Sequence, residues 1–163
     1  MRTRMPKLGI ILLCVLFVFE GCAWWVNPHS PESAEKKLSK YFSDIETVNN
    51  YMIDTKYSSF YIDSIDGKAF ADLNHVTIND KEIIISITNL LKFGEVESIS
   101  MRDNTINYTL WFGHQEISCG IAYSINQIDP PEITYVTELV QLTKPGWYYY
   151  VADFNEWRVR NSK

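Results

Sequence analysis

The segment EISCGIAYSI, residues 116–125, alternates between two kinds of side chain along its whole length. One set of alternate positions is apolar and consists of Ile117, Cys119, Ile121, Tyr123 and Ile125. The other set is small and consists of Ser118, Gly120, Ala122 and Ser124. Because successive side chains of a strand point to opposite faces of a sheet, this alternation predicts a β-strand with one apolar face. The small residues predict that a helix or another chain segment approaches the other face closely.

Four further segments with strand character accompany this one in the C-terminal part of the chain. They are residues 96–101, 105–112, 133–142 and 147–154. Turn-forming residues separate them, namely Asp103-Asn104, Gly113-His114, Asp129-Pro130-Pro131 and Lys144-Pro145-Gly146. Short strands divided by such turns predict an antiparallel meander of about five strands.

A hairpin is predicted upstream of the meander. Residues 60–65 and 68–73 flank Asp66-Gly67, and this dipeptide is the type that best supplies the two positive φ angles of a tight hairpin turn. A helix is predicted to follow, because Asn79-Asp80-Lys81-Glu82 suits a helix start with a capping-box-like acid at its third position, and apolar residues continue at helical spacing as far as Gly94. The β-branched run of residues 83–85 also fits a buried strand.

An earlier helix is predicted to begin at Ser30, whose side chain can cap it, with Pro31 in the first helical position. Its apolar residues recur at intervals of three and four and are Ala34, Leu38, Tyr41, Ile45, Val48 and Met52. This stripe favours a helix lying on a sheet over a partner-binding or coiled-coil helix. We therefore predict a single α+β domain over residues 32–163, with two helices packed on one face of a mainly antiparallel sheet.

The N-terminus has the pattern of an export signal. Arg2, Arg4 and Lys7 precede an unbroken apolar run over residues 8–19. A basic region followed by an apolar region of this length directs a chain to the secretion machinery. The rest of the chain is therefore expected on the extracytoplasmic side of a membrane.

The end of this signal, Phe19-Glu20-Gly21-Cys22, resembles the signal sequence of bacterial lipoproteins. Gly21 and Cys22 match the family pattern, whereas Glu20 departs from it, because small or apolar residues are usual there. The resemblance implies cleavage after residue 21 and lipidation of Cys22, followed by a tether over residues 22–31. Several acyl chains together anchor a protein stably.

Two other interpretations of the N-terminus remain open. Residues 8–26 form a stretch of 19 residues, close to the length of an uncleaved membrane-spanning signal anchor. The segment also fits an ordinary secretory peptide that is removed. In all three cases the basic flank stays inside and residues from about 27 onward face outward.

Charge and cysteine content limit the classes of partner. The chain has a formal net charge of −5, and since residues 1–21 contain three basic residues and one acidic residue, the remainder carries −7. This sign argues against binding to nucleic acid. Only Cys119 follows Cys22, so no intramolecular disulfide is expected. No sequence motif indicates a cofactor.

Catalytic and metal-binding patterns are weak. Cys119 lies five residues after His114, but its position on the apolar face of the predicted strand favours a buried, inert thiol over a nucleophile. His29, His75 and His114 are isolated from one another and lack the spacing of metal ligands. We therefore predict neither a catalytic centre nor a metal site.

The aromatic C-terminus is the one candidate binding surface. It comprises Trp147, Tyr148, Tyr149, Tyr150 and Trp157. A strand over these residues would present large rings on both faces, of which only one can enter the core. We predict a membrane-anchored extracytoplasmic binding or interaction protein without catalytic activity, such as an inhibitor or immunity-type protein or a glycan binder. The alternative is an envelope hydrolase whose site only the fold assembles.

Overall fold

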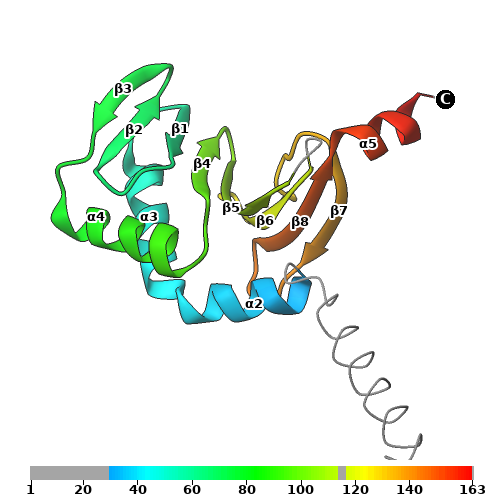
Figure 1. Cartoon of the computed structure of the whole chain (residues 1–163), viewed down its shortest axis with the longest axis horizontal. Helices are drawn as coiled ribbons and strands as arrows, with labels where there is room; N and C mark the ends of the chain where they lie inside the picture. The colour runs from blue at the N-terminus through cyan, green and yellow to red at the C-terminus, as the bar shows by residue number, and fades with distance from the viewer. Residues whose placement is uncertain (1–29, 114–116, 163) are drawn as a thin grey trace, which may run out of the picture.

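The structure is a computed structural model that describes residues 30–113 and 117–162 (Figure 1). These residues form an α+β fold with four α-helices, one π-helical turn and an eight-stranded antiparallel sheet. The predicted class is confirmed, although two helices and roughly five to seven strands were too few. The predicted export signal, the predicted lipidation site at Cys22 and the residues His29 and His114 lie outside the described part of the chain.

The first predicted helix is present as two helices, α2 (Pro31–Lys40) and α3 (Phe42–Asp54). The side chain of Ser30 accepts a hydrogen bond from the amide of Ser33 at 3.3 Å, which confirms the predicted cap, and the helix begins at Pro31. The prediction of one continuous helix was wrong, because the backbone of Tyr41 leaves helical geometry with ψ at 19°. The Tyr41 hydroxyl donates instead to the carbonyl oxygen of Phe93, at 2.6 Å.

The second predicted helix is also present. Asp80 caps it by accepting from the amides of Glu82 and Ile83, and the helix continues as α4 (Lys81–Thr88) and a π-helical turn η1 (Asn89–Phe93). The strand alternative for residues 83–85 is therefore wrong. A further helix, α5 (Phe154–Asn161), begins where the last predicted strand was to end, capped by Asp153.

The eight strands form one sheet in the order β3-β2-β1-β4-β5-β6-β8-β7. They are β1 (Ser59–Ile62), β2 (Lys68–Ala71), β3 (Asn74–Thr77), β4 (Ser98–Arg102), β5 (Thr105–Phe112), β6 (Ile117–Ser124), β7 (Val136–Gln141) and β8 (Trp147–Asp153). A simple meander is wrong at its end, because β8 lies between β6 and β7. The burial of the two strands is consistent with this order. β8 is largely buried on both faces, whereas β7 is half-buried to exposed and lies at the edge of the sheet.

The predicted hairpin pairs β1 with β2, but its loop is longer than the predicted two-residue turn. Only Gly67 of the Asp66-Gly67 dipeptide has a positive φ. The two-residue turn lies one connection later, between β2 and β3, where Asp72 and Leu73 have φ of 45° and 67°. Two successive positive φ angles define the turn type that favours asparagine, aspartate and glycine, so Leu73 is an unfavourable residue there.

Replacement of Leu73 by glycine should stabilise the protein. The side chain is 98% exposed and therefore contributes no packing, while its left-handed backbone is strained. Relief of that strain exceeds the extra entropy of glycine in the unfolded chain, so we expect the free energy of unfolding to rise by about 0.5 to 1 kcal/mol. Urea denaturation measures this change in the free energy of unfolding. Leu73→Ala is the control, because it removes the apolar side chain and keeps the strain; equal stabilisation by both variants would contradict the explanation.

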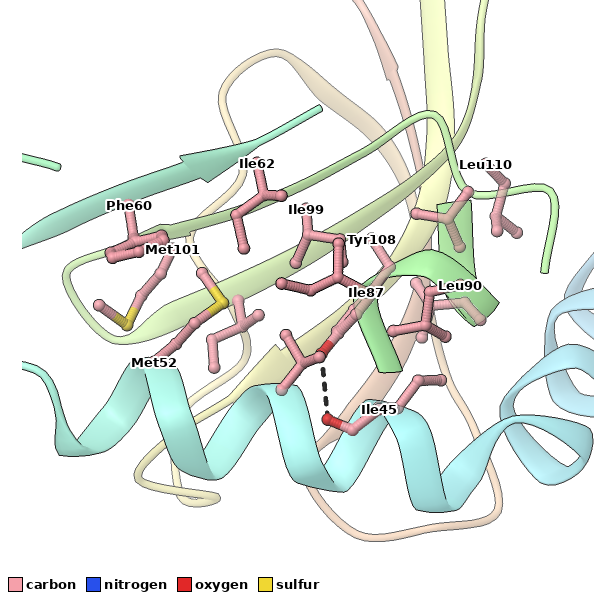
Figure 2. Packing of buried hydrophobic residues seen from close by; sticks show 14 of the residues in the cluster. Ile45, Met52, Phe60, Ile62, Ile87, Leu90, Ile99, Met101, Tyr108 and Leu110 are labelled. Atoms are coloured by element: carbon pink, nitrogen blue, oxygen red, sulfur yellow. Dashed lines mark hydrogen bonds between the residues drawn. The ribbon is translucent and has the colours of Figure 1, made fainter. Parts of the chain in front are cut away.

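The hydrophobic core lies between one face of the sheet and the helices α2, α3 and α4, which Figure 1 shows along the same side of the sheet. Figure 2 shows Ile45 and Met52 of α3 turned toward strand residues that include Ile99 and Met101. Tyr108 of β5 is fully buried among them. Its hydroxyl donates to Asn49 Oδ1 at 2.7 Å and approaches the carbonyl oxygen of Ile45 at 3.2 Å. This contact fixes α3 on the sheet.

The buried hydroxyl of Tyr108 predicts a loss of stability in alkali. Burial raises its pKa well above the ordinary value of 10. Above pH 10 the unfolded chain therefore loses a proton that the folded chain keeps, and the free energy of unfolding falls by about 1.4 kcal/mol per pH unit for this residue. Tyr108→Phe should be about 1 to 2 kcal/mol less stable at pH 7, because Asn49 loses its donor, yet its stability should fall less steeply above pH 10. Denaturant titrations at pH 7 and 11 measure both effects, and equal alkaline slopes would contradict the second.

The opposite face of the sheet, here called the outer face, is covered in part by the segment that leads into β7. A second apolar cluster forms there from Ala122, Tyr150 and Ala152 together with Ile133, Val136 and Leu139. Gly120 lies at its border, and a Cβ atom at this position would lie 2.9 Å from the Tyr150 ring. The predicted close approach to the small face of residues 116–125 is thus confirmed.

Candidate ligand-binding cleft

The uncovered part of the outer face carries mainly polar side chains. Strand alternation places Ile106, Tyr108 and Leu110 of β5 in the core and turns Asn107 and Thr109 outward. Strand pairing sets Ser100 of β4 opposite Asn107. The same alternation that builds the core therefore collects hydroxyl and amide groups on the other side.

These side chains form the floor of a cleft with a volume of about 300 Å³, here called the outer cleft. Its polar floor and rim include Ser100, Arg102, Asn107, Thr109, Ser118 and Glu132. Residues 132–134 and Tyr150 form the wall. The wall segment is held in place because the amide of Glu132 donates to the hydroxyl of Thr105 at 2.9 Å. Small-ligand sites are usually concave, and their polar groups fix the orientation of the ligand.

Asn107 is the most informative residue of the outer cleft. Its side-chain oxygen is buried and accepts no hydrogen bond from any residue that the structure describes. A buried acceptor without a donor costs about 1 to 3 kcal/mol, so such atoms are normally paired. The oxygen is closed to solvent in this arrangement, so a turn of the Asn107 side chain toward the cleft is needed before water or a ligand can supply the donor and remove this cost.

Tyr150 adds a hydroxyl to the wall. Its oxygen lies 3.4 Å from the hydroxyl oxygen of Thr109. Burial raises the pKa of Tyr150 to about 12, while the contact with Thr109 opposes that shift. The group is therefore neutral at physiological pH, where it can donate and accept hydrogen bonds but is a poor nucleophile.

A row of aromatic side chains, Tyr61, Phe70 and His75, continues the outer face beyond the cleft. Each faces the next across a pair of strands, because Tyr61 is paired with Phe70 and Phe70 with His75. The rings of Phe70 and His75 are 4.2 Å apart between centroids. Tyr61 is also paired with Ser100 on β4, so this aromatic row borders the polar floor directly. Tyr61 and Phe70 are 40% and 43% exposed, which leaves ring surface open to a ligand.

A second groove, about 280 Å³ in volume, lies between α3 and the ends of β6 and β8. Its aromatic and polar groups largely contact one another. The ammonium group of Lys144 lies 3.8 Å from the centre of the Phe42 ring, and Gln127 donates to the hydroxyl of Tyr123 at 2.6 Å. No lining atom of this groove is among the buried polar atoms left without a partner in the described residues. The outer cleft is therefore the better candidate.

The predicted aromatic surface on β8 is not assembled as expected. Trp147 and Tyr149 are 4% and 1% exposed and belong to the core, and Tyr150 is buried on the outer face. Tyr148 is half-buried, and Trp157 lies on α5, where its ring packs 5.1 Å from that of Tyr135. The physical reason is that both faces of β8 are covered: one face packs in the main core, and the other packs at Tyr150 against the second cluster with Ile133 and Leu139.

Cys119 is buried in the core, as predicted from the alternation of its strand. Burial raises the pKa of its thiol to about 11, so the reactive thiolate is scarce at neutral pH. The ring of His75 packs at a tilt of 46° against that of Phe70 in the aromatic row. Within residues 30–113 and 117–162, no three His, Cys, Asp or Glu side chains come close enough to hold a metal ion.

No family model, curated protein or solved structure matches this chain. In the part of the chain that the structure covers, no helix has both the length and the apolar character needed to cross a bilayer. Asn107, Ser100 and Tyr61 were not among the binding residues predicted from the sequence. The polar alternation of residues 105–109 is the signal that could have indicated the polar face.

Proposed function

We propose that this protein is a non-catalytic binding protein of the bacterial cell envelope that takes its ligand in the outer cleft. The unpaired, buried oxygen of Asn107 carries the proposal, because a ligand donor would satisfy it. The surrounding groups are hydroxyls, one guanidinium and one carboxylate, a set suited to hydrogen bonding. An inhibitor or immunity-type protein and an envelope hydrolase are the other functions that the sequence left open.

Attachment to the membrane is part of this proposal. It is supported by the basic residues and apolar run of the N-terminus and by Gly21-Cys22 at its end. Lipidation of Cys22 would place the domain on the extracytoplasmic face, joined by a tether that ends near Pro31.

A substitution at Cys22 tests the anchor. In a bacterial host, Cys22→Ala should leave residues 1–21 uncut or release the protein from the membrane, because the sulfur that takes the lipid is lost. Mass spectrometry of the membrane-bound chain measures the result. An unmodified chain that keeps residues 1–21 in the wild type would favour the signal anchor over the lipoprotein.

Binding is tested with the full chain in mild detergent, incubated separately with purified cell-wall polymer and with envelope membranes. We expect co-sedimentation with at least one fraction and at least a fivefold loss of retention for Asn107→Ala. Asn79→Ala is the control, because this exposed asparagine lies away from the cleft. Equal retention of Asn107→Ala and wild type would contradict the proposed site. Release of soluble fragments from the polymer would support the hydrolase instead.

A further inference from the structure

We propose that the ligand of the outer cleft is a neutral saccharide chain, with one sugar unit bound at Asn107 and a neighbouring unit stacked on Tyr61 and Phe70. This inference rests on the proposed function, since it identifies the chemical class of ligand at the same site. Two features of the outer face carry it, the unpaired polar groups of the floor and the aromatic row beside them.

The polar floor matches the hydrogen-bonding character of a sugar. Asn107 Oδ1 needs a donor, and the hydroxyls of Ser100 and Ser118 make no hydrogen bond with another described residue. A serine hydroxyl both donates and accepts, as does each hydroxyl of a sugar. A ligand with several hydroxyls on adjacent carbons could therefore pair with all three side chains. An apolar ligand would leave Asn107 unsatisfied.

The aromatic row provides the second half of the site. One face of a sugar ring consists of C–H groups, whose hydrogens carry a slight positive charge. These groups pack on the electron-rich face of an aromatic ring, as the positive edge of one ring does on the face of another. Tyr61 and Phe70 are adjacent across β1 and β2 and are both partly exposed.

The spacing of the two halves indicates the length of the ligand. Asn107 lies on β5 and Tyr61 on β1, with only β4 between them. Neighbouring strands are ~4.8 Å apart, so the two side chains arise ~10 Å from each other. This span exceeds one sugar ring, which predicts preference for an oligosaccharide over a monosaccharide.

The charge of the site favours a neutral saccharide. The polar residues lining the cleft include one basic residue, Arg102, and one acidic residue, Glu132. The chain as a whole is acidic, with a formal charge of −5. Its field repels polyanions such as phosphate-rich or uronic acid polymers.

Calorimetric titration of the full chain in mild detergent tests the proposal. The probes are the trimer of N-acetylglucosamine, cellotriose and maltotriose, each compared with its monosaccharide. We expect at least one trimer to bind at least tenfold more tightly than its monomer. Tyr61→Ala should weaken trimer binding at least tenfold and change monomer binding less than twofold. Asn107→Ala should weaken both.

Two control variants distinguish a loss of binding from a loss of folding. Phe93→Ala removes an exposed aromatic ring that lies on the helical side of the molecule and should bind like wild type. Tyr61→Trp keeps a stacking surface and should retain trimer binding. Thermal melting of each variant confirms that the fold is intact.

The outcomes separate this inference from the proposed function. If no probe binds the wild type, the saccharide proposal is overturned, whereas Asn107-dependent retention on an envelope fraction would still support the binding function. Binding that is insensitive to both Asn107 and Tyr61 would overturn the site. If Asn107→Ala stabilises the protein without altering binding of any probe, the cleft holds water alone and the inference is again wrong.

Discussion

Substitution of Gly120 by alanine should prevent the protein from folding stably. A Cβ atom at this position would overlap the carbonyl oxygen of Tyr108 on β5 and lie 2.9 Å from the ring of Tyr150 on β8. The first contact is with backbone in the centre of the sheet, so a change of rotamer cannot relieve it. We expect the free energy of unfolding to fall by about 4 kcal/mol or more. Urea denaturation of the purified variant and of the wild type measures this difference.

Two variants identify the cause of that loss. Ser118→Ala lies on the same strand and the same face and should change stability by less than about 0.5 kcal/mol, because its side chain is only half-buried. Removal of the Tyr150 ring in Gly120→Ala/Tyr150→Ala should not restore the fold, since the overlap with the Tyr108 carbonyl remains. Recovery in the double variant would show that the ring, rather than the backbone, excludes a side chain at position 120.

Local pattern was sufficient to predict most elements of this fold. The alternation of residues 116–125 identified β6 and its apolar face, and the helix cap at Ser30 and a helix start within residues 79–82 are present as expected. These features depend only on residues that are close together in the chain, so they can be predicted from a single sequence. The tight turn at Asp72-Leu73 was missed because leucine is rare at a positive φ, and the neighbouring Asp66-Gly67 has the more typical composition.

Long-range strand order could not be predicted in the same way. β8 follows β7 in sequence but inserts beside β6, and the pairing of β1 with β4 joins segments separated by a hairpin and a helix. Alternation gives the face on which a side chain lies, whereas pairing depends on which strands bury the most surface together. For this reason the polar character of Asn107 was visible in the sequence, and its position beside Ser100 and Tyr61 was not.

Truncation of Tyr149 should be the most damaging change within the C-terminal aromatic run. Its side chain is 1% exposed in the core, between Ile121 of β6 and Val140 of β7 in the strand pairing. Tyr149→Ala removes a full aromatic ring from this position, and we expect the free energy of unfolding to fall by about 3 to 5 kcal/mol. Tyr149→Phe keeps the ring and should cost only about 1 kcal/mol, because it removes the hydroxyl alone.

The adjacent residue Tyr148 provides the matched comparison. It differs from Tyr149 only by one position in the same strand, but it points to the outer face and is half-buried. Tyr148→Ala should therefore cost about 1 kcal/mol or less. Thermal and urea denaturation of the three variants measure the contrast directly. Because a shift of one residue would exchange the two faces of the strand, a larger loss for Tyr148→Ala than for Tyr149→Ala would show that β8 pairs in a different register. The wall of the outer cleft would then be formed by Tyr149 in place of Tyr150, and the proposed ligand site would have to be built again from that register.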